Sequence, residues 1–465
     1  MVAATLKHQV CIGLLVAALS ACKDDGDADG GADESSSSGD NPTTSTTVAP
    51  TTSTTDPTDG CVPGSEDCTC SDGECVGEMQ CVADVCKPGP QFDPQEDEEP
   101  IVLAGLWVPV QVEVNADEYS WSQVDGPMTT ILGDGASIQV PVPSDAAPGD
   151  VITLRIEATR NTIVDQFDYH ITVLEPVFED VLGTIDDPAE LGSVGGLDFD
   201  DNGNLWVSSS EGFVSRFDNM PSFLNTYDVG TGAAGVQLGR IYDAVNEDDI
   251  PALFVALTGE QRIVALNLAN QQVQEITAEI DGGAGLGPVD IVVPDDDRNV
   301  FMSNGTQILR WQTDDQGAAT TTVISEALTN PITAMSRGPD ANVLYVGTQG
   351  KVWRVGVQQD GTANEPVLYL DIGDEADPLQ AVAGIAFDNG GNMFVGVPGN
   401  NTLHLAPYRA ETATSIVRSF IAPAAGFDAF RSLRYGNDAF SRSALYWTDT
   451  VDGTVGRLET GLRGR

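Results

Sequence analysis

The 465-residue sequence has little positive charge. It contains 21 Lys and Arg residues against 71 Asp and Glu residues, which gives a formal net charge of -50. A nucleic-acid-binding surface needs clustered Lys and Arg facing the phosphates, so the composition excludes nucleic acid as a partner. It also disfavours direct contact with an anionic membrane surface. The acidity indicates a well-solvated surface, with binding of divalent cations as the alternative.

Long apolar runs are also missing, apart from one near the N-terminus. That run, VCIGLLVAAL at residues 10–19, follows Lys7 and is too short to span a bilayer. A basic start, a brief apolar core and small residues are typical of an export signal, here residues 1–21. The alternative is an ordinary secretory signal in which the cysteine that follows is incidental.

The end of this signal, Leu19-Ser20-Ala21-Cys22, resembles the bacterial lipobox. The resemblance implies cleavage before Cys22 and a diacylglycerol on its thiol. We therefore expect a membrane partner held through this lipid, and an exported protein anchored in the bacterial cell envelope. Lys23-Asp24 after the cysteine favours the outer membrane.

No aromatic residue occurs between Lys23 and Gly60, where the chain consists mainly of Asp, Gly, Ser, Thr and Pro. Such a segment cannot bury enough apolar surface to offset the entropy lost on ordering. We predict that residues 22–60 form a disordered acidic tether.

Cysteine is absent after residue 86, and six cysteines lie in the window CVPGSEDCTCSDGECVGEMQCVADVC. An even number in an exported segment predicts a disulfide framework, which a window this small needs because it cannot hold a hydrophobic core. Zinc is the alternative, but the paired CxxC spacing of zinc sites is missing. We predict a disulfide-rich module at residues 61–88, with the cysteines Cys61, Cys68, Cys70, Cys75, Cys81 and Cys86.

Residues 99–176 contain short alternating apolar and polar runs separated by turn residues, which predicts an immunoglobulin-like β-sandwich. Strands are expected at 108–114, 118–124, 136–142, 151–159 and 165–174. Tyr119-Ser120-Trp121-Ser122-Gln123, followed by Asp125-Gly126-Pro127, resembles the WxQxxGP turn of PKD-type domains of cell-surface proteins. The resemblance implies that Trp121 is a core residue between two sheets.

Residues 177–465 repeat one pattern six times: a strand, an Asp/Asn/Gly turn, an aromatic-containing strand and a further strand. The matching aromatic positions, 44 to 52 residues apart, are Trp206, Phe254, Phe301, Tyr345, Phe394 and Tyr446. This period predicts a six-bladed β-propeller. The last copy lacks a fourth strand, and we expect residues 177–185 (VFEDVLGTI) to supply it and close the ring.

Two motifs in these repeats resemble a known group of propellers. Tyr446-Trp447-Thr448-Asp449 matches the YWTD tetrapeptide, and the segment from Gly196 to Val207 resembles the opening of an NHL or lactonase-type blade. The chain thus resembles the six-bladed group that spans YWTD receptor propellers, NHL repeats and gluconolactonase-like enzymes. The resemblance implies the fold but no single activity, because this fold hosts binding proteins and enzymes alike.

Lactonases of this group hold one divalent metal at the propeller axis through a Glu, an Asn and an Asp, with the Glu just before a Gly-Pro-Val strand. Here Leu286 precedes Gly287-Pro288-Val289, so the ligands do not transfer residue by residue. The propeller segment contains one histidine, His404, and no cysteine, which disfavours a His-based metal centre or a Ser-His-Asp triad.

Calcium or another divalent cation has one weak candidate site, Asp198, Asp200 and Asn202. Their spacing resembles part of a calcium loop, but Ser209 stands where a bidentate Glu would be expected. Similar Asp/Asn/Gly turns recur in other copies, which favours turn formation over metal binding.

The remaining candidate site is a binding surface made by the turns between second and third strands, which a propeller gathers on one face. Their mixed donors and acceptors suit a protein or saccharide partner. The residues are Glu211, Glu260, Arg262, Asn304, Gln307, Gln349, Lys351, Asn400, Asn401, Asp449 and Asp452.

The sequence therefore predicts an all-β chain, in which a small disulfide-rich module and an immunoglobulin-like β-sandwich precede a six-bladed β-propeller. As a function we expect a lipid-anchored, non-enzymatic binding module at the cell envelope. A metal-dependent hydrolase of lactones or small esters is the alternative.

Overall fold

The computed structural model describes most of the chain after residue 65. The described residues are 66–68, 70, 75, 79–92, 99–181, 193–243, 248–277, 289–294, 299–313, 319–325, 327–358, 361–373, 377, 380–409, 412–421, 430–437, 439–450 and 453–465. The chain divides into residues 1–60 and 61–465, and all described residues belong to the second unit. The predicted signal, Cys22 and the tether lie outside them. Among the described residues, no helix is both long and apolar enough to cross a membrane.

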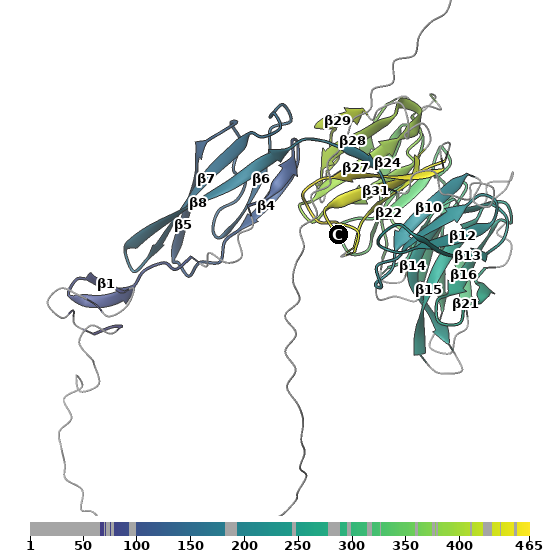
Figure 1. Ribbon diagram of the computed structural model, residues 1–465, viewed down its shortest axis with the longest axis horizontal. Helices are drawn as coiled ribbons and strands as arrows, with labels where there is room; N and C mark the ends of the chain where they lie inside the picture. Colours follow the sequence, from purple (N-terminus) through teal and green to yellow (C-terminus); the bar gives the residue numbers. More distant parts are fainter. Residues whose placement is uncertain are drawn as a thin grey trace, which may run out of the picture. The chain divides into compact units, whose positions relative to one another are not determined.

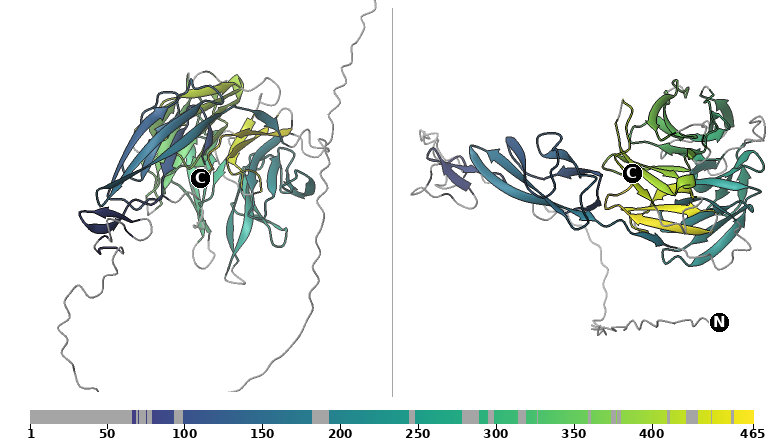
Figure 2. Two further views of the ribbon diagram at one scale, coloured as in Figure 1. Left: turned by 60° about the vertical axis from the view of Figure 1, so that its left-hand side comes forward. Right: turned by 90° about the horizontal axis from the view of Figure 1, so that it is seen from above.

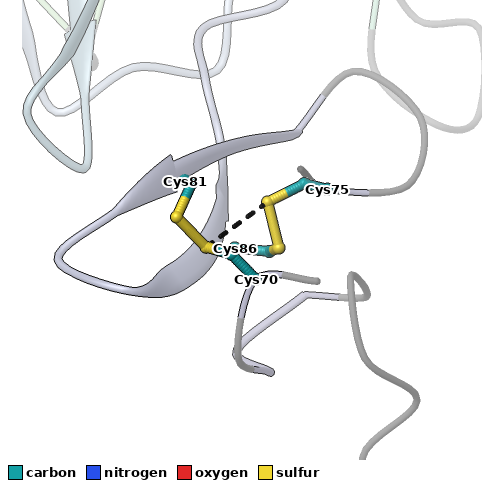
Figure 3. Close-up of a disulfide and its surroundings, with 4 residues drawn as sticks. All are labelled: Cys70, Cys75, Cys81 and Cys86. Atoms are coloured by element: carbon teal, nitrogen blue, oxygen red, sulfur yellow. Dashed lines mark hydrogen bonds between the residues drawn. A yellow bond between two sulfur atoms is a disulfide. The ribbon is translucent and has the colours of Figure 1, made fainter. Parts of the chain in front are cut away.

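The cysteine-rich segment forms a small hairpin stapled to the chain that precedes it. Strands β1 (Met79–Val82) and β2 (Val85–Pro88) pair antiparallel, with Cys81 opposite Cys86. Disulfides join Cys70 to Cys81 and Cys75 to Cys86, so each hairpin strand is linked to a different preceding cysteine, as Figure 3 shows. Cys68 is also disulfide-bonded, whereas Cys61 lies outside the described residues. The predicted disulfide module is confirmed.

Residues 101–174 form two β-sheets around a shared apolar core. One sheet has the order β3-β8-β7-β5 and the other pairs β4 with β6. The strands are β3 (Ile101–Leu103), β4 (Trp107–Gln111), β5 (Glu118–Asp125), β6 (Ser137–Pro141), β7 (Val151–Arg160) and β8 (Ile163–Leu174). Strand β3, which the sequence analysis missed, pairs parallel with β8. The immunoglobulin-like class remains a prediction.

Trp121 packs against the core of these two sheets but is only half-buried. It lies on β5, at the end of the four-stranded sheet, and its Nε1 donates to the carbonyl of Gly135 at 2.8 Å. The expectation of a core tryptophan is therefore met only in part, because an edge strand leaves one side of the ring uncovered.

The remaining strands form six four-stranded antiparallel sheets, which are the blades of a propeller (Figure 1). First strands are β10 (Val194–Phe199), β14 (Ala233–Asp243), β18 (Ile291–Val292), β22 (Ala334–Arg337), β26 (Gly384–Phe387) and β30 (Phe430–Tyr435). Second strands are β11 (Leu205–Ser209), β15 (Asp248–Leu257), β19 (Asn299–Asn304), β23 (Val343–Gly347), β27 (Asn392–Val397) and β31 (Ala444–Asp449).

Third strands are β12 (Phe213–Phe217), β16 (Arg262–Asn267), β20 (Gln307–Thr313), β24 (Lys351–Gly356), β28 (Thr402–Pro407) and β32 (Thr454–Glu459). Fourth strands are β13 (Phe223–Asp228), β17 (Val273–Glu275), β21 (Ala319–Val323), β25 (Val367–Asp371), β29 (Arg418–Ile421) and, for the last blade, β9 (Phe178–Asp180). A short 3-10 helix, η2 (Pro398–Asn400), joins β27 to β28.

The ring of blades is closed at two levels. Strand β9 pairs antiparallel with β32, so the segment before the first blade completes the last one, as predicted. The first strands also contact one another in cyclic order, and β30 contacts β10. Figure 2 shows the blades from two further sides. Six sheets arranged in this way confirm the six-bladed propeller.

Burial decreases from the second strand of each blade to the fourth. Second strands such as β11, β23 and β31 are buried along their whole length, whereas β17 and β21 are fully exposed. The six repeating aromatic residues lie in second strands, and none is more than 7% exposed. The repeat therefore marks the apolar layers between blades.

The two-sheet region contacts the propeller at blade 5, β26–β29. The side chain of Asn392 accepts a hydrogen bond from the Trp107 backbone N–H at 2.7 Å and donates to the Trp107 carbonyl at 3.0 Å. Arg418 donates to the Ala104 carbonyl at 3.1 Å, and Leu106 and Leu405 belong to one apolar cluster. Sequence analysis did not predict this docking.

Candidate functional site

A cavity of about 620 Å³ lies where the first strands of all six blades converge. In each blade, the residue paired with the repeating aromatic lines this cavity. These six residues, here called the axial ring, are Asp198, Gln237, Val292, Ser336, Ala386 and Arg434. Each repeating aromatic lies in a second strand, and its partner lies in the first strand of the same blade, next to the axis. The positions of the axial ring therefore follow from the positions of the aromatic repeat.

Polar ring residues also tie neighbouring blades together. The Asp198 carboxylate of blade 1 accepts the backbone N–H of Leu238 in blade 2 at 2.7 Å. Gln237 of blade 2 accepts the backbone N–H of Val293 beside blade 3 at 2.9 Å. Asp290, which precedes β18, accepts the N–H of Met335 in blade 4 at 2.8 Å. Backbone groups at the axis are thus satisfied by side chains of the preceding blade.

The cavity lining is strongly basic although the chain is strongly acidic. Five of the 21 Lys and Arg residues of the chain line it, together with one acidic side chain, Asp198. Arg434 is half-buried in the axial ring. The other four are exposed at the opening and are here called the rim arginines: Arg337, Arg442, Arg463 and Arg465.

Burial and the guanidinium of Arg434 act in opposite directions on two axial carboxyl groups. Burial raises the pKa values of Asp198 and Asp290, because a desolvated carboxylate is penalised. The positive charge of Arg434 and the backbone N–H donors lower both pKa values by a smaller amount. Arg434 is therefore partly balanced by these two carboxyl groups.

The axial ring does not fit a lactonase-type metal centre. A divalent cation of that kind needs several carboxylate or amide oxygens, but the ring offers one carboxylate and one amide, and both already accept backbone N–H groups. Arg434 adds a positive charge to the same ring, which disfavours a second cation there. Among the described residues, the only cluster of three or more His, Cys, Asp or Glu side chains is formed by disulfide cysteines.

The candidate calcium loop is instead an Asp-anchored turn. Asp200 Oδ1 accepts the backbone N–H groups of Asn202 and Asn204 at 3.0 and 2.9 Å, and its Oδ2 accepts the indole N–H of Trp206 at 2.9 Å. Asp198 is bonded elsewhere, to Leu238 in the axial ring. The structure therefore does not bring Asp198, Asp200 and Asn202 together around one point.

The predicted binding face lies at the other end of the blades from the cavity. In β10, Val194 pairs with Ser209 next to the turn of Glu211, whereas Asp198 and Phe199 lie at the far end of the strand. Blades 2, 4, 5 and 6 show the same register: the first strand begins beside the turn between the second and third strands, and its axial-ring residue lies two to four residues further along.

Several residues of that face are bound within their own blade. Glu260 accepts the Thr231 backbone N–H at 2.7 Å and pairs with Arg262 at 2.5 Å, and Arg262 also pairs with Glu275. These contacts lower the pKa of Glu260, chiefly through the Thr231 bond. Lys351 lies over the ring of Trp353.

Burial further reduces the number of predicted face residues that are accessible to a partner. Asp449 is fully buried and Asn304 is 8% exposed, because each ends a second strand inside the sheet. Glu211 and Asn400 are exposed, Gln307, Gln349 and Asn401 are half-buried, and Asp452 lies outside the described residues. The structure thus places the described members of this set at one end of the blades, and none of them lines the axial cavity.

His404 and the cavity are unrelated. Its Nδ1 lies 2.9 Å from Ser419 Oγ on the outer strand β29, and burial lowers its pKa. This supports the structural role expected from its place in a strand.

Sequence reasoning missed the cavity arginines. Arg434 pairs with Tyr446 of YWTD in the neighbouring strand. The residue expected to pair with each repeating aromatic was therefore the available signal. Arg442, Arg463 and Arg465 carry no such signal, because they lie outside the repeated strands.

Comparisons with known proteins give only low similarity. No family model matches the chain, and no curated protein matches it. The chain is similar to a solved gluconolactonase candidate (12% identity, TM-score 0.45, covering 62% of this chain and 94% of that one). It is also similar to a luciferin-regenerating enzyme (13% identity, TM-score 0.47, covering 63% of this chain and 98% of that one). A third similar structure is an auxiliary nutrient binding protein from Bacteroides ovatus (12% identity, TM-score 0.44, covering 79% of this chain and 99% of that one). At this similarity no activity transfers, and the six-bladed fold rests on the strand pairing described above.

Proposed function

We propose that the propeller is a non-enzymatic binding module that takes a small molecule in its axial cavity. The observation that carries the proposal is the cavity itself, which all six blades line and whose volume lies in the range of small-molecule sites. The described lining has no histidine or cysteine, and its one carboxylate already accepts backbone N–H groups. Arginine stays protonated and serves recognition, not proton transfer.

The test is a ligand screen by thermal shift with the exported chain, residues 22–465. A ligand that binds the cavity should raise the melting temperature of the wild type. Ser336→Trp, which fills the axial ring, should abolish the shift. Ser210→Trp, in an exposed turn at the opposite end of blade 1, is the matched control and should retain it. Equal shifts in all three proteins would remove the cavity as the site.

We further propose that the chain is lipid-anchored through Cys22 in the cell envelope, outer membrane favoured, and that residues 101–174 are an immunoglobulin-like spacer. The lipobox-like Leu19-Ser20-Ala21-Cys22 supports the anchor. Metabolic labelling with an alkyne fatty acid should tag the wild type and the Cys11→Ser variant but not Cys22→Ser. Labelling of Cys22→Ser would contradict the anchor.

A further inference from the structure

Residues 460–465, here called the post-blade segment, lie between the two-sheet region and the axial cavity. The start of the segment packs against strand β3, where the Leu103 N–H donates to the Thr460 carbonyl at 3.1 Å. A Cβ at Gly461 would collide with the Ile101 carbonyl oxygen, so only glycine allows this approach. The first two residues of the segment are therefore in direct contact with the two-sheet region.

Leu462 continues this contact into the propeller. It is 7% exposed and belongs to the apolar cluster that also contains Leu103 and Leu106 of the two-sheet region and Trp447 of blade 6. Undocking of the two-sheet region would expose part of this cluster to water, which is unfavourable. The docked two-sheet region consequently stabilises the observed position of Leu462.

The end of the segment forms part of the cavity wall. Residues 463–465 line the cavity, and two of them are rim arginines. The Gly464 N–H donates to the Arg442 carbonyl at 2.8 Å, and the Arg465 N–H donates to the Phe387 carbonyl at 3.2 Å. Arg442 and Phe387 are lining residues themselves. One short stretch of chain thus contacts the two-sheet region at its start and completes the cavity wall at its end.

The turn of blade 5 links docking to the segment a second time. The Asn389 N–H donates to the Arg463 carbonyl at 2.8 Å. In the same turn, the Asn392 side chain bonds both backbone groups of Trp107. Coupling between two sites requires a continuous set of packed or bonded groups that both sites influence. The post-blade segment and the blade 5 turn provide such a set between the two-sheet region and the cavity.

We propose that the two-sheet region controls access to the axial cavity. While it is docked, residues 460–465 stay in the cavity wall. When it undocks, the segment loses its contacts with β3, leaves the wall and opens the cavity. An order–disorder change of a short segment is a common way in which docking acts on a site. This inference rests on the proposed function of the same cavity and names the regulation of that site.

A cysteine in the axial ring measures access to the cavity. Ser336→Cys is made in residues 22–465 with Cys22→Ser, and the rate of its reaction with N-ethylmaleimide, a small neutral reagent, is measured. The same chain without Ser336→Cys gives the background from the cysteine module. Ser210→Cys, in an exposed turn at the opposite end of blade 1, controls for the reactivity of the thiol.

The docking contact is disturbed from the two-sheet side, so that the propeller sequence stays intact. Gly105 has φ +92, and a Cβ there would lie 3.2 Å from side-chain atoms of Arg418 and Leu405 in blade 5. Gly105→Leu should therefore push the two-sheet region off the propeller. Gly149→Leu is the matched control, because Gly149 has φ +87 in the same region but no atom within 4 Å of its Cβ.

Gly105→Leu should raise the labelling rate of the axial-ring cysteine roughly tenfold or more, because even a modest loss of docking stability multiplies the open population. Hydrogen exchange of residues 101–111 and 460–465 should become faster together. Residues 343–347, the buried strand β23 of blade 4, should keep their protection, which shows that the propeller stays folded. Gly149→Leu should change neither the labelling nor the exchange of the post-blade segment.

The failures of the two proposals are distinct. If Gly105→Leu speeds exchange of residues 101–111 but changes neither labelling nor exchange of residues 460–465, the control of access is wrong and the proposed function is untouched. Gly461→Leu, which would collide with Ile101, is the second variant. If neither variant speeds exchange of residues 101–111, the inference is also overturned, because docking then does not depend on these contacts. Faster labelling in Gly105→Leu, with no ligand found in the wider screen, would support the control of access and count against the proposed function.

Discussion

The propeller has two equivalent turns with the same Asp–Asn hydrogen bonds but different contacts. They are residues 200–204 in blade 1 and 388–392 in blade 5. In each, an aspartate accepts the backbone and side-chain N–H groups of an asparagine four residues later, at 2.8 to 3.0 Å. In blade 1 the second carboxylate oxygen also accepts the Trp206 indole N–H, and the turn serves its own blade. In blade 5 the asparagine amide turns outward and pairs with both backbone groups of Trp107.

The residue before the turn glycine accounts for the difference. Blade 5 has Gly390 where blade 1 has Asn202. A Cβ at Gly390 would lie 2.5 Å from the Trp107 carbonyl oxygen, so only glycine allows this approach. A repeated turn can therefore become a docking site through the loss of one side chain.

The largest expected effect is on how the free energy of unfolding changes with pH when Asp388 is replaced, as in Asp388→Asn. Burial raises the pKa of Asp388 to about 7, although bonds from Asn392 act the other way. The folded protein thus binds this proton more tightly than the unfolded chain, whose carboxyl titrates near 3.8. Between these values the wild type should lose stability relative to the variant as pH rises, by on the order of 4 kcal/mol in total.

Urea unfolding of both proteins between pH 4 and 8 measures this difference. Tyr435 lies in the field of Asp388 but titrates well above this range. Asp200→Asn in blade 1 is the control, because it changes the equivalent aspartate and its hydrogen bonds to Asn204. A difference between wild type and Asp388→Asn that stays constant with pH would show that Asp388 does not titrate in this window.

Asn392→Ala should cost about 3 kcal/mol in the free energy of unfolding, since it leaves the Asp388 carboxylate and both Trp107 backbone groups without their partner. Asn204→Ala, which breaks only the bonds to Asp200, should cost less. Calorimetry compares the two, and hydrogen exchange of residues 101–111 reports undocking. Equal losses would mean that docking adds nothing to the blade 5 turn.

Gly390→Asn gives blade 5 the residue of blade 1 and should cost about 2 kcal/mol through the clash with Trp107. We expect faster hydrogen exchange in residues 101–111 with little change in the axial strands. The reverse exchange, Asn202→Gly, should leave residues 101–111 unaffected. Unchanged exchange in Gly390→Asn would contradict the close approach.

The smallest effect is expected for Gly391→Ala. Gly391 has φ +80, and a Cβ there would make only ordinary van der Waals contact, with Tyr408 Cβ at 3.6 Å, so the cost is conformational and about 1 kcal/mol. Gly203 has φ +75, but a Cβ there would lie 2.5 Å from that of Ala439. Gly203→Ala should therefore lower the melting temperature more than Gly391→Ala, and the opposite order would refute the packing argument.

Much of the architecture was readable from the sequence because it depends on local patterns. Alternation of apolar and polar residues predicted all five expected strands of the two-sheet region to within two residues at their starts, and the aromatic repeat predicted the blades. Closure by β9 followed from counting strands. Strand β3 was missed because three residues are too few to show alternation.

The candidate site was not readable in the same way. The turns chosen from the sequence are polar and recur in every blade, but their side chains bond within their own blades or are buried. The arginines that line the cavity come from separate segments, Arg337 from blade 4 and Arg463 from the chain after the last blade.

The sequence alone determined the number of blades, the disulfide module and the identity of the buried layer, because strand alternation, cysteine spacing and the aromatic repeat are properties of neighbouring residues. Only the tertiary structure decided which end of the axis is hollow, which side chains meet there and which turn receives the two-sheet region. These depend on contacts between segments far apart in the sequence, which no local pattern relates.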